Sequence, residues 1–172
     1  MPPSLRPAIA ADAPALAAVH VEGWRWGYRG LLPAALLDAI SVADREALWR
    51  KALGPGGTTA AVVAEHAGAV VAFAAWGPPL GPAEDGAAEL YALYQREACA
   101  GTGLGRALLA AATEGMRQAG HRQALLWVLR ENARAQAFYA RHGWDPDGAT
   151  GLEVRDGVTL VDIRYSLDLT AR

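Results

Sequence analysis

Two hydrophobic patterns alternate along the chain, and each predicts its own kind of secondary structure. Short apolar runs rich in β-branched and aromatic residues, bounded by glycine and proline, predict strands. Apolar residues spaced three or four positions apart predict helices. Strands are expected at 4–9, 58–64, 69–76, 89–94, 123–129, from 144 onward and at 159–167, and helices at 12–23, 34–40, 41–53, 103–120 and 132–141. The length of 172 residues, without repeats or a low-complexity linker, predicts a single domain spanning 1–172.

Composition narrows the function classes. Hydrophobic residues make up 52% of the chain, which excludes a disordered protein. No apolar run reaches the roughly 18 residues needed to cross a membrane, and the first residues lack the apolar core of a signal peptide. The net charge of −2 gives no basic field for nucleic acid, and the single cysteine, Cys99, fits a reducing cytoplasm. We therefore expect a cytoplasmic protein, and the abundance of arginine and alanine suggests a bacterial source.

The stretch 89–109, ELYALYQREACAGTGLGRALL, is the most informative part of the chain. An apolar run leads into Gly101, Gly103 and Gly105 and then directly into a strong helix former. A helix start has about four backbone N–H groups without an intrahelical partner and a partial positive charge. Glycines let an anion approach these groups, so the stretch predicts a phosphate site. Neither the dinucleotide fingerprint nor the Walker A motif fits, and glycines that merely turn the chain stay an alternative.

This loop resembles the one that binds acetyl-coenzyme A in the GNAT family, the Gcn5-related N-acetyltransferases. The family motif reads Gln/Arg-x-x-Gly-x-Gly/Ala, and both later glycines match here, while Ala100 stands at the leading position. The resemblance implies a backbone cradle for the pyrophosphate, and the position of Arg106 at the helix start would bring its side chain close to phosphate. The implied cradle consists of Gly101, Thr102, Gly103, Leu104 and Gly105.

A second motif, at 127–144, resembles the family more specifically. A strand is followed by Asn132, by a helix ending in Phe138-Tyr139, and then by Gly143 and an aromatic residue. Seven positions separate Asn132 from Tyr139, so both lie on one helix face. The resemblance implies that Asn132 contacts the pantetheine arm and that Tyr139 lies beside the sulfur. The alternatives are a helix cap for Asn132 and a core aromatic for Tyr139.

The resemblance covers nearly the whole chain and implies the GNAT fold. That fold is an α+β arrangement with a mostly antiparallel sheet of about seven strands, flanked by helices, in which strands four and five splay apart. Pantetheine would add into the gap between these strands through the backbone of Leu93, Tyr94 and Gln95. Exposed arginines are usually solvated, so Arg130 and Arg134 are not assigned to the cofactor site.

Acetyl transfer requires a base for the amine and an acid or hydrogen-bond donor for the thiolate. The matching position of a catalytic glutamate in the histone-acetylating branch of the family is Glu89, which makes it the candidate base. Proton transfer from an ammonium with a pKa near 10.4 to a glutamate with a pKa near 4.3 is unfavourable by roughly 8 kcal/mol. To act as the base, Glu89 therefore needs a raised pKa, a water relay or an acceptor that is already partly neutral. Proton transfer from the Tyr139 hydroxyl to the thiolate is unfavourable by only about 2 kcal/mol. A second branch carries its base where this chain has Trp127, which cannot act as one.

Other chemistries find little support. No serine lies in a G-x-S-x-G motif, and the four histidines show no metal-ligand spacing, so we expect no metal. The segment 24–30 interleaves aromatic rings with arginines, a composition that suits a pocket wall. The candidates for the wall of the acceptor pocket are Trp24, Trp26, Tyr28, Arg29 and Trp76.

The sequence therefore predicts an acetyl-CoA-dependent N-acetyltransferase that transfers the acetyl group directly to an amine. The acceptor, a small molecule or a peptide, is not identifiable from the sequence, and the protein is expected as a monomer or homodimer without nucleic-acid or membrane partners. The alternative is a non-catalytic acyl-CoA-binding or regulatory domain of the same fold, which Ala100 favours.

Overall fold

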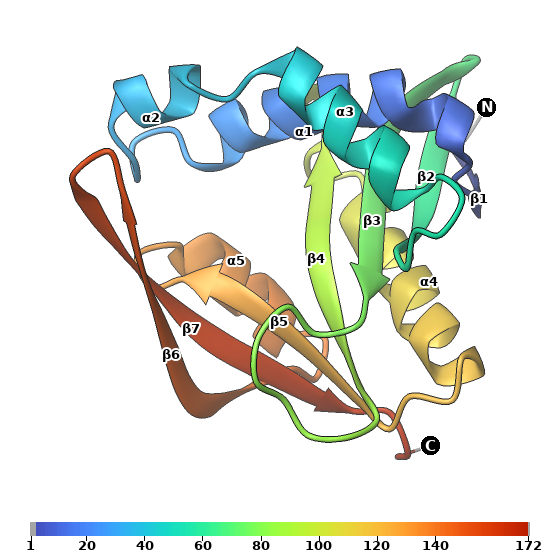
Figure 1. The fold of residues 1–172 in the computed structure, drawn as a ribbon, viewed down its shortest axis with the longest axis vertical. Helices are drawn as coiled ribbons and strands as arrows, with labels where there is room; N and C mark the ends of the chain where they lie inside the picture. The colour runs from blue at the N-terminus through green and yellow to red at the C-terminus, as the bar shows by residue number, and fades with distance from the viewer. Residues whose placement is uncertain (1–2, 172) are drawn as a thin grey trace.

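The computed structural model describes residues 3–171 and contains one mixed sheet in the strand order β1-β2-β3-β4-β5-β7-β6 (Figure 1). Only the central pair, β4 and β5, is parallel, and every other neighbouring pair is antiparallel. The predicted mostly antiparallel sheet of about seven strands is confirmed. The strands are β1 (Ser4–Pro7), β2 (Ala60–His66), β3 (Ala69–Gly77), β4 (Ala87–Gln95), β5 (Gln123–Leu129), β6 (Asp145–Arg155) and β7 (Val158–Asp168).

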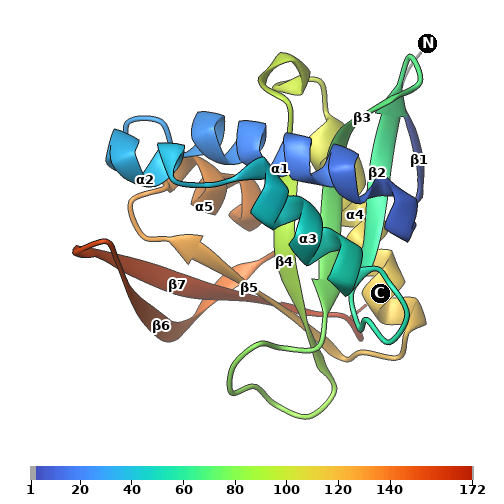
Figure 2. The ribbon, with the colours of Figure 1, turned by 45° about the horizontal axis from the view of Figure 1, so that its top comes forward.

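Helices cover both faces of the sheet. Two of them, α1 and α3, lie on one face, and α4 and α5 pack on the other (Figure 2). The helices are α1 (Ala13–Gly27), α2 (Ala34–Asp38), α3 (Val42–Ala52), α4 (Leu104–Gln118) and α5 (Ala133–Ala140), with short 3₁₀ turns η1 (Ala10–Asp12) and η2 (Glu97–Cys99). Among residues 3–171, no helix combines the length and the apolar character needed to cross a membrane.

Helix α1 continues four residues beyond the predicted end at Gly23. The reason is packing, because a Cβ atom at Gly23 would lie 3.0 Å from Cβ of Tyr94 on β4. The glycine thus allows helix and strand to approach closely and does not end the helix. The extension brings Trp24 and Trp26 into helical structure.

A bulge in β4 decides which side chains reach each face. Leu90 pairs with Trp76 and Ala92 pairs with Ala75, so Tyr91 is the extra residue. Leu90 packs on the α4 side, whereas Tyr91 and Ala92 both pack on the side of α1 and α3. A bulge of this kind breaks the alternation of a strand. Tyr94 therefore faces α1, although regular alternation from Leu90 would turn it toward α4.

Beyond the bulge, β4 and β5 separate. Their parallel pairing covers only Ala87–Glu89 on β4 and Gln123–Leu125 on β5. Figure 1 shows β5, β6 and β7 running away from β4 from this point on. The predicted splay is confirmed, and the edge of β4 from residue 90 to 95 is left open toward β5.

Candidate active site

One cavity of about 560 Å³ occupies the gap between the splayed strands. Its size falls within the range of small-molecule sites. The wall combines the open part of β4 with the glycine loop, the end of α1, the middle of β5 and one face of α5. The lining residues are Gly23, Trp26, Gly27, Tyr28, Leu90 to Gln95, Ala100, Gly101, Gly103, Gly105, Arg106, Leu126 to Val128, Asn132, Arg134, Ala135, Phe138, Tyr139 and Arg141.

The glycine loop has the backbone conformation that an anion cradle needs. Gly101 has φ of 75° and Gly103 has φ of 84°, values that residues with a Cβ atom adopt rarely. Gly103 is the N-cap of α4, so the free N–H groups of the helix begin there. Thr102 and Leu104 do not line the cavity, because the Thr102 hydroxyl donates to the carbonyl of Cys99 and Leu104 is buried in the core. At these two positions only the backbone groups are able to contact an anion bound at the loop.

Three arginines line the cavity, and only one of them, Arg106, was assigned to the cofactor site from the sequence. Arg106 comes from the first turn of α4, Arg134 comes from α5, and Arg141 is the C-cap residue directly after α5. The guanidinium of Arg134 lies over the ring of Trp26, 4.2 Å from its centroid. The spacing of seven between Arg134 and Arg141 puts both on one helix face, and this was the available signal. Arginines at such a site suit the binding of phosphate.

Polar groups also line the gap between the strands. Oε1 of Gln95 is buried and has no hydrogen-bond partner within residues 3–171. Asn132 is buried, and its Oδ1 accepts a hydrogen bond of 3.0 Å from the backbone N–H of Ala135, so it caps α5. Asn132 also lines the cavity. Leu93, Tyr94 and Gln95 all line the open edge of β4.

Three tyrosines from different elements meet at the centre of the cavity. Tyr28 follows α1, Tyr94 lies on β4 beyond the bulge, and Tyr139 lies on α5. Burial raises the pKa of Tyr139 above its usual value, and the neighbouring Tyr28 raises it further. The pKa of Tyr94 is raised by burial and by both other phenols. All three side chains therefore remain neutral hydrogen-bond donors at neutral pH.

Glu89 is not one of the residues that line the cavity, although it directly precedes Leu90, where the lining stretch of β4 begins. Its side chain is 6% exposed, and Oε2 accepts a hydrogen bond of 2.9 Å from the backbone N–H of Leu80. Burial raises the pKa of Glu89, while the Leu80 amide and the charge of Arg164 partly oppose the increase. The environment that the sequence analysis required of a glutamate base is therefore present.

The candidates for the acceptor wall divide into two groups. Trp26 and Tyr28 line the cavity, as predicted. The other three do not line this cavity: Trp24 packs in a small core with Tyr28, Arg29 pairs with Glu97 on the surface, and the ring of Trp76 packs against Gly115 of α4. The ring of Trp127 takes part in the wall and is 38% exposed.

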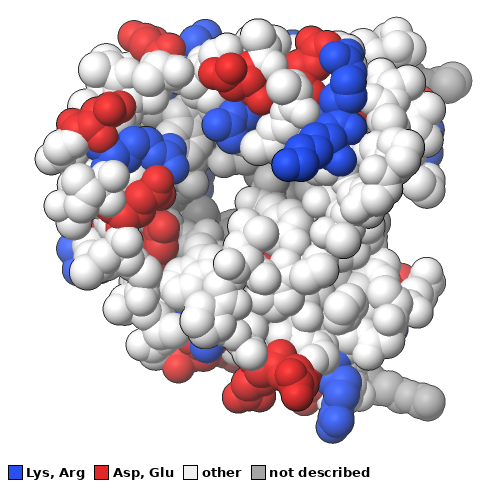
Figure 3. Space-filling model, viewed as in Figure 1, with Lys and Arg blue, Asp and Glu red and all other residues white. Residues whose placement is uncertain are grey.

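Figure 3 shows a deep hollow at the centre of one face of the molecule, with charged side chains around its rim. Comparison with Figure 1 places this hollow between the helices α1 to α3, the hairpin of β6 and β7, and the loop between β3 and β4. Within residues 3–171, no group of three or more histidine, cysteine, aspartate or glutamate side chains is arranged to hold a metal ion.

A sheet split at its centre, a glycine loop at a helix start and a cavity that joins them define an acyl-CoA N-acyltransferase fold. The family model described as "Acetyltransferase (GNAT) family" matches residues 26–144. The chain belongs to this family of acyltransferases.

Individual relatives agree with this assignment. The chain is 33% identical over 160 residues to the Bacillus subtilis protein named "Uncharacterized N-acetyltransferase YuaI", covering 93% of this chain and 90% of the relative. Among solved structures, PaiA N-acetyltransferase from Thermoplasma acidophilum, in complex with coenzyme A, matches with a TM-score of 0.72, 20% identity, and coverage of 98% and 99%. YncA from Salmonella typhimurium, a putative acetyltransferase with its cofactor acetyl-CoA, matches with a TM-score of 0.71, 22% identity, and coverage of 100% and 96%. At these identities the two structures establish the fold.

Proposed function

We propose that the protein is an acetyl-CoA-dependent N-acetyltransferase that transfers the acetyl group directly to an amine while both substrates are bound. The observation that carries this proposal is the single cavity linking the glycine loop, the open edge of β4 and Tyr139. Acetyl-CoA would supply the acetyl group as a thioester, and the relatives with coenzyme A or acetyl-CoA support this cosubstrate.

The residues present fit such a cosubstrate. The N–H groups from Gly101 to Arg106 would bind the pyrophosphate, and the three arginines would provide counter-charges. The open edge of β4 and the amide of Asn132 would hold the pantetheine amides. The unpaired Oε1 of Gln95 offers an acceptor that a bound amide N–H could satisfy. Ala100 contributes no polar side-chain contact, so binding depends on the backbone at this position.

Transfer forms a bond between the amine nitrogen and the acetyl carbon and breaks the C–S bond. The nitrogen of the incoming ammonium loses two protons: the base removes one, which is released, and the other passes to the departing sulfur, so one proton is released overall. In our proposal Glu89 receives a proton of the incoming ammonium through one water molecule, because Glu89 precedes the lining stretch of β4 and does not itself line the cavity. Its raised pKa lowers the roughly 8 kcal/mol that opposes proton transfer to an ordinary glutamate.

Tyr139 serves the departing thiolate in this scheme. Its raised pKa makes full proton transfer to sulfur harder than for an ordinary tyrosine, so a hydrogen bond from its hydroxyl is the favoured role. Donors aimed at developing charge in a buried site contribute about a hundredfold or more to the rate.

The proposal is tested by measuring the turnover of acetyl-CoA with a panel of amines. Tyr139→Phe should lower kcat about a hundredfold and leave the KM for acetyl-CoA nearly unchanged, since only the hydroxyl is lost. An unchanged kcat would remove Tyr139 from the mechanism.

Calorimetry with coenzyme A, combined with the turnover assay, distinguishes the proposed acetyltransferase from the alternative of a non-catalytic binding domain. Tight binding without turnover on any amine would support that alternative, and no binding at all would refute both. The oligomeric state, a monomer or homodimer, and the cytoplasmic location remain predictions made from the sequence.

A further inference from the structure

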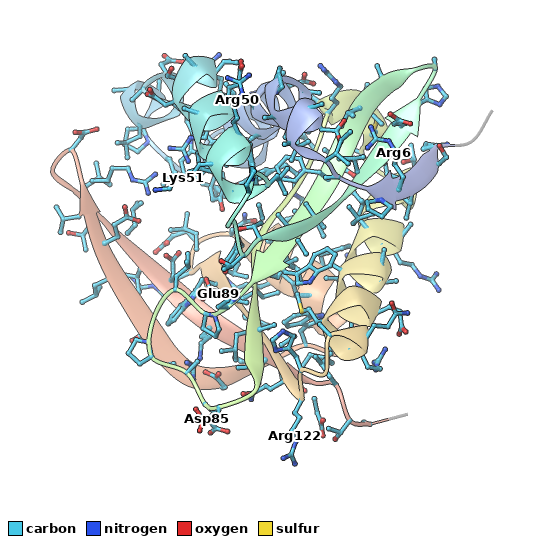
Figure 4. The ribbon with its side chains drawn as sticks, turned by 45° about the vertical axis from the view of Figure 1, so that its right-hand side comes forward. Arg6, Arg50, Lys51, Asp85, Glu89 and Arg122 are labelled. Atoms are coloured by element: carbon cyan, nitrogen blue, oxygen red, sulfur yellow. The ribbon has the colours of Figure 1, made fainter. Side chains whose placement is uncertain are left out.

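The loop between β3 and β4, residues 78–86, covers the carboxylate of Glu89. In Figure 4, Glu89 lies near the middle of the molecule, and the loop that carries Asp85 curves below it. The Leu80 side chain is 80% exposed, yet its backbone N–H points inward and donates to Glu89. At the start of the loop, the hydroxyl of Tyr91 donates to the carbonyl of Pro78.

The middle of this loop has a second attachment, which comes from β7. Nη1 of Arg164 donates to the carbonyl of Pro82 at 3.3 Å, and Nε donates to Oδ2 of Asp147 on β6 at 2.7 Å. The guanidinium also lies 5.8 Å from the ring centroid of Trp127 in the cavity wall. One side chain thus joins the loop, the β6–β7 hairpin and the wall of the candidate active site.

We propose that Arg164 is a positioning residue for acetyl transfer: it holds the loop 78–86 against the sheet and thereby keeps the Leu80 amide on the carboxylate of Glu89. This inference rests on the proposed role of Glu89 as the base. Within residues 3–171, the hydrogen bonds that attach residues 80–82 to the sheet are the one to Glu89 and the one from Arg164. Loss of the second therefore leaves the first as the only hydrogen bond from residues 80–82 to the sheet, while Pro78 and Gly86 at the two ends of the loop keep their bonds to Tyr91 and Arg122.

The charges around Glu89 set the direction of the effect. Arg164 on β7 is the positive group that acts on it, paired with Asp147 on β6, and Tyr91 is its titratable neighbour on β4. The paired residues Gly77 on β3 and Leu125 on β5 are uncharged, and the loop's own acids, Glu84 and Asp85, are exposed. Without Arg164, Glu89 loses a favourable charge and the support of its hydrogen bond. Its pKa then rises further.

The test is the pH profile of kcat/KM for acetyl-CoA and an amine substrate in Arg164→Gln. The acid limb, where the base loses activity by protonation, should move to higher pH by about half to one unit. At the optimum, kcat/KM should fall about tenfold because the base is less well placed. Arg117→Gln is a matched control, since Arg117 also donates one hydrogen bond to a carbonyl, Leu169, and one to a carboxylate, Glu114, at a distant site. It should keep the wild-type profile.

Two further variants separate charge from attachment. Asp147→Asn keeps Arg164 but removes its counter-charge, so the acid limb should move to lower pH, opposite to Arg164→Gln. Arg164→Lys keeps the positive charge but cannot bridge both acceptors, so it should restore the acid limb and only part of kcat/KM. Equal profiles for Arg164→Gln and Arg117→Gln would overturn the inference.

Hydrogen exchange at the Leu80 amide gives a readout that does not need turnover. In the protein without substrates, this amide should exchange about tenfold faster in Arg164→Gln than in the wild type or Arg117→Gln. Exchange at the wild-type rate would overturn the anchoring role even if the enzyme is active. A wild-type protein with no turnover on any amine would count against the proposed function alone, and the exchange experiment would still decide the role of Arg164.

Discussion

Burial raises the pKa of both candidate catalytic side chains, with opposite consequences. For Glu89 the change favours a base, because a carboxylate with a higher pKa takes a proton from an amine more readily. For Tyr139 it disfavours an acid and favours a neutral hydrogen-bond donor. The sequence could locate both residues through motif positions. It could not give their pKa values, which depend on the Leu80 amide, on Arg164 and on Tyr28.

At the scale of one residue, His20 should make the fold sensitive to mild acid. Nδ1 of this half-buried side chain accepts a hydrogen bond of 3.2 Å from Nε1 of Trp49, and the imidazole ring stacks on Tyr94. Burial, with a contribution from Arg45, lowers the pKa of His20 to about 4 from 6.5. As the pH falls, the unfolded chain therefore binds the proton first. The contribution of neutral His20 to the stability of the folded state is complete above about pH 6.5 and is lost by about pH 4. The difference corresponds to about 3 kcal/mol.

Urea denaturation at pH 7 and pH 4.5 checks this prediction. His20→Asn keeps an acceptor near the position of Nδ1 but does not titrate, so it should be less stable at pH 7 and lose less stability on acidification. His66→Asn, at the exposed end of β2, controls for the removal of one histidine. An acid-induced loss as large in His20→Asn as in the wild type would contradict the assignment to His20.

At the scale of the elements, replacing one helical glycine by alanine should have the opposite of its usual effect on stability. Alanine stabilises most helix interiors by roughly 1 kcal/mol relative to glycine. Gly115 in α4 is different, because a Cβ atom there would lie 2.4 Å from Cζ2 of Trp76 on β3. Gly115→Ala should therefore lower the free energy of unfolding by about 1–3 kcal/mol. Ala110→Gly, at an exposed position of the same helix, measures propensity alone, and a gain in stability for Gly115→Ala would show that Trp76 moves aside freely.

The elements also show which features of the fold the sequence was sufficient to predict. Helices α4 and α5 begin within one residue of their predicted starts, because a glycine in the left-handed conformation and the cap at Asn132 are local signals. The bulge at Tyr91 was not predictable, since it exists only in the pairing of β4 against β3. The close approach at Gly23 depends in the same way on a distant strand. Local signals in the loops and helix ends could therefore be predicted from the sequence, whereas features that depend on packing between distant elements could not.

At the scale of the whole molecule, the sheet consists of two parts joined by a short parallel ladder. Strands β1 to β4 form one part and β5 to β7 the other, and only three residue pairs connect them at the centre. The proposed cosubstrate would lie between these parts and touch both, from the start of α4 and β4 on one side to α5 on the other. Its binding should therefore stabilise the protein and reduce the motion of the strand and helix residues that border the gap.

Thermal unfolding and hydrogen exchange with coenzyme A test this expectation together. At a concentration one hundred times its Kd, a ligand of the native state adds about 2.7 kcal/mol, which for a chain of this size raises Tm by about 5–10 °C. Protection from exchange should be greatest at residues 90–95 of β4 and in α5, whereas β2, which is already paired on both sides, should change little. Because stabilisation alone would follow from binding anywhere on the native protein, the exchange pattern is the decisive part. A higher Tm without protection at 90–95 would place coenzyme A outside the gap and would refute the strand-addition mode of binding.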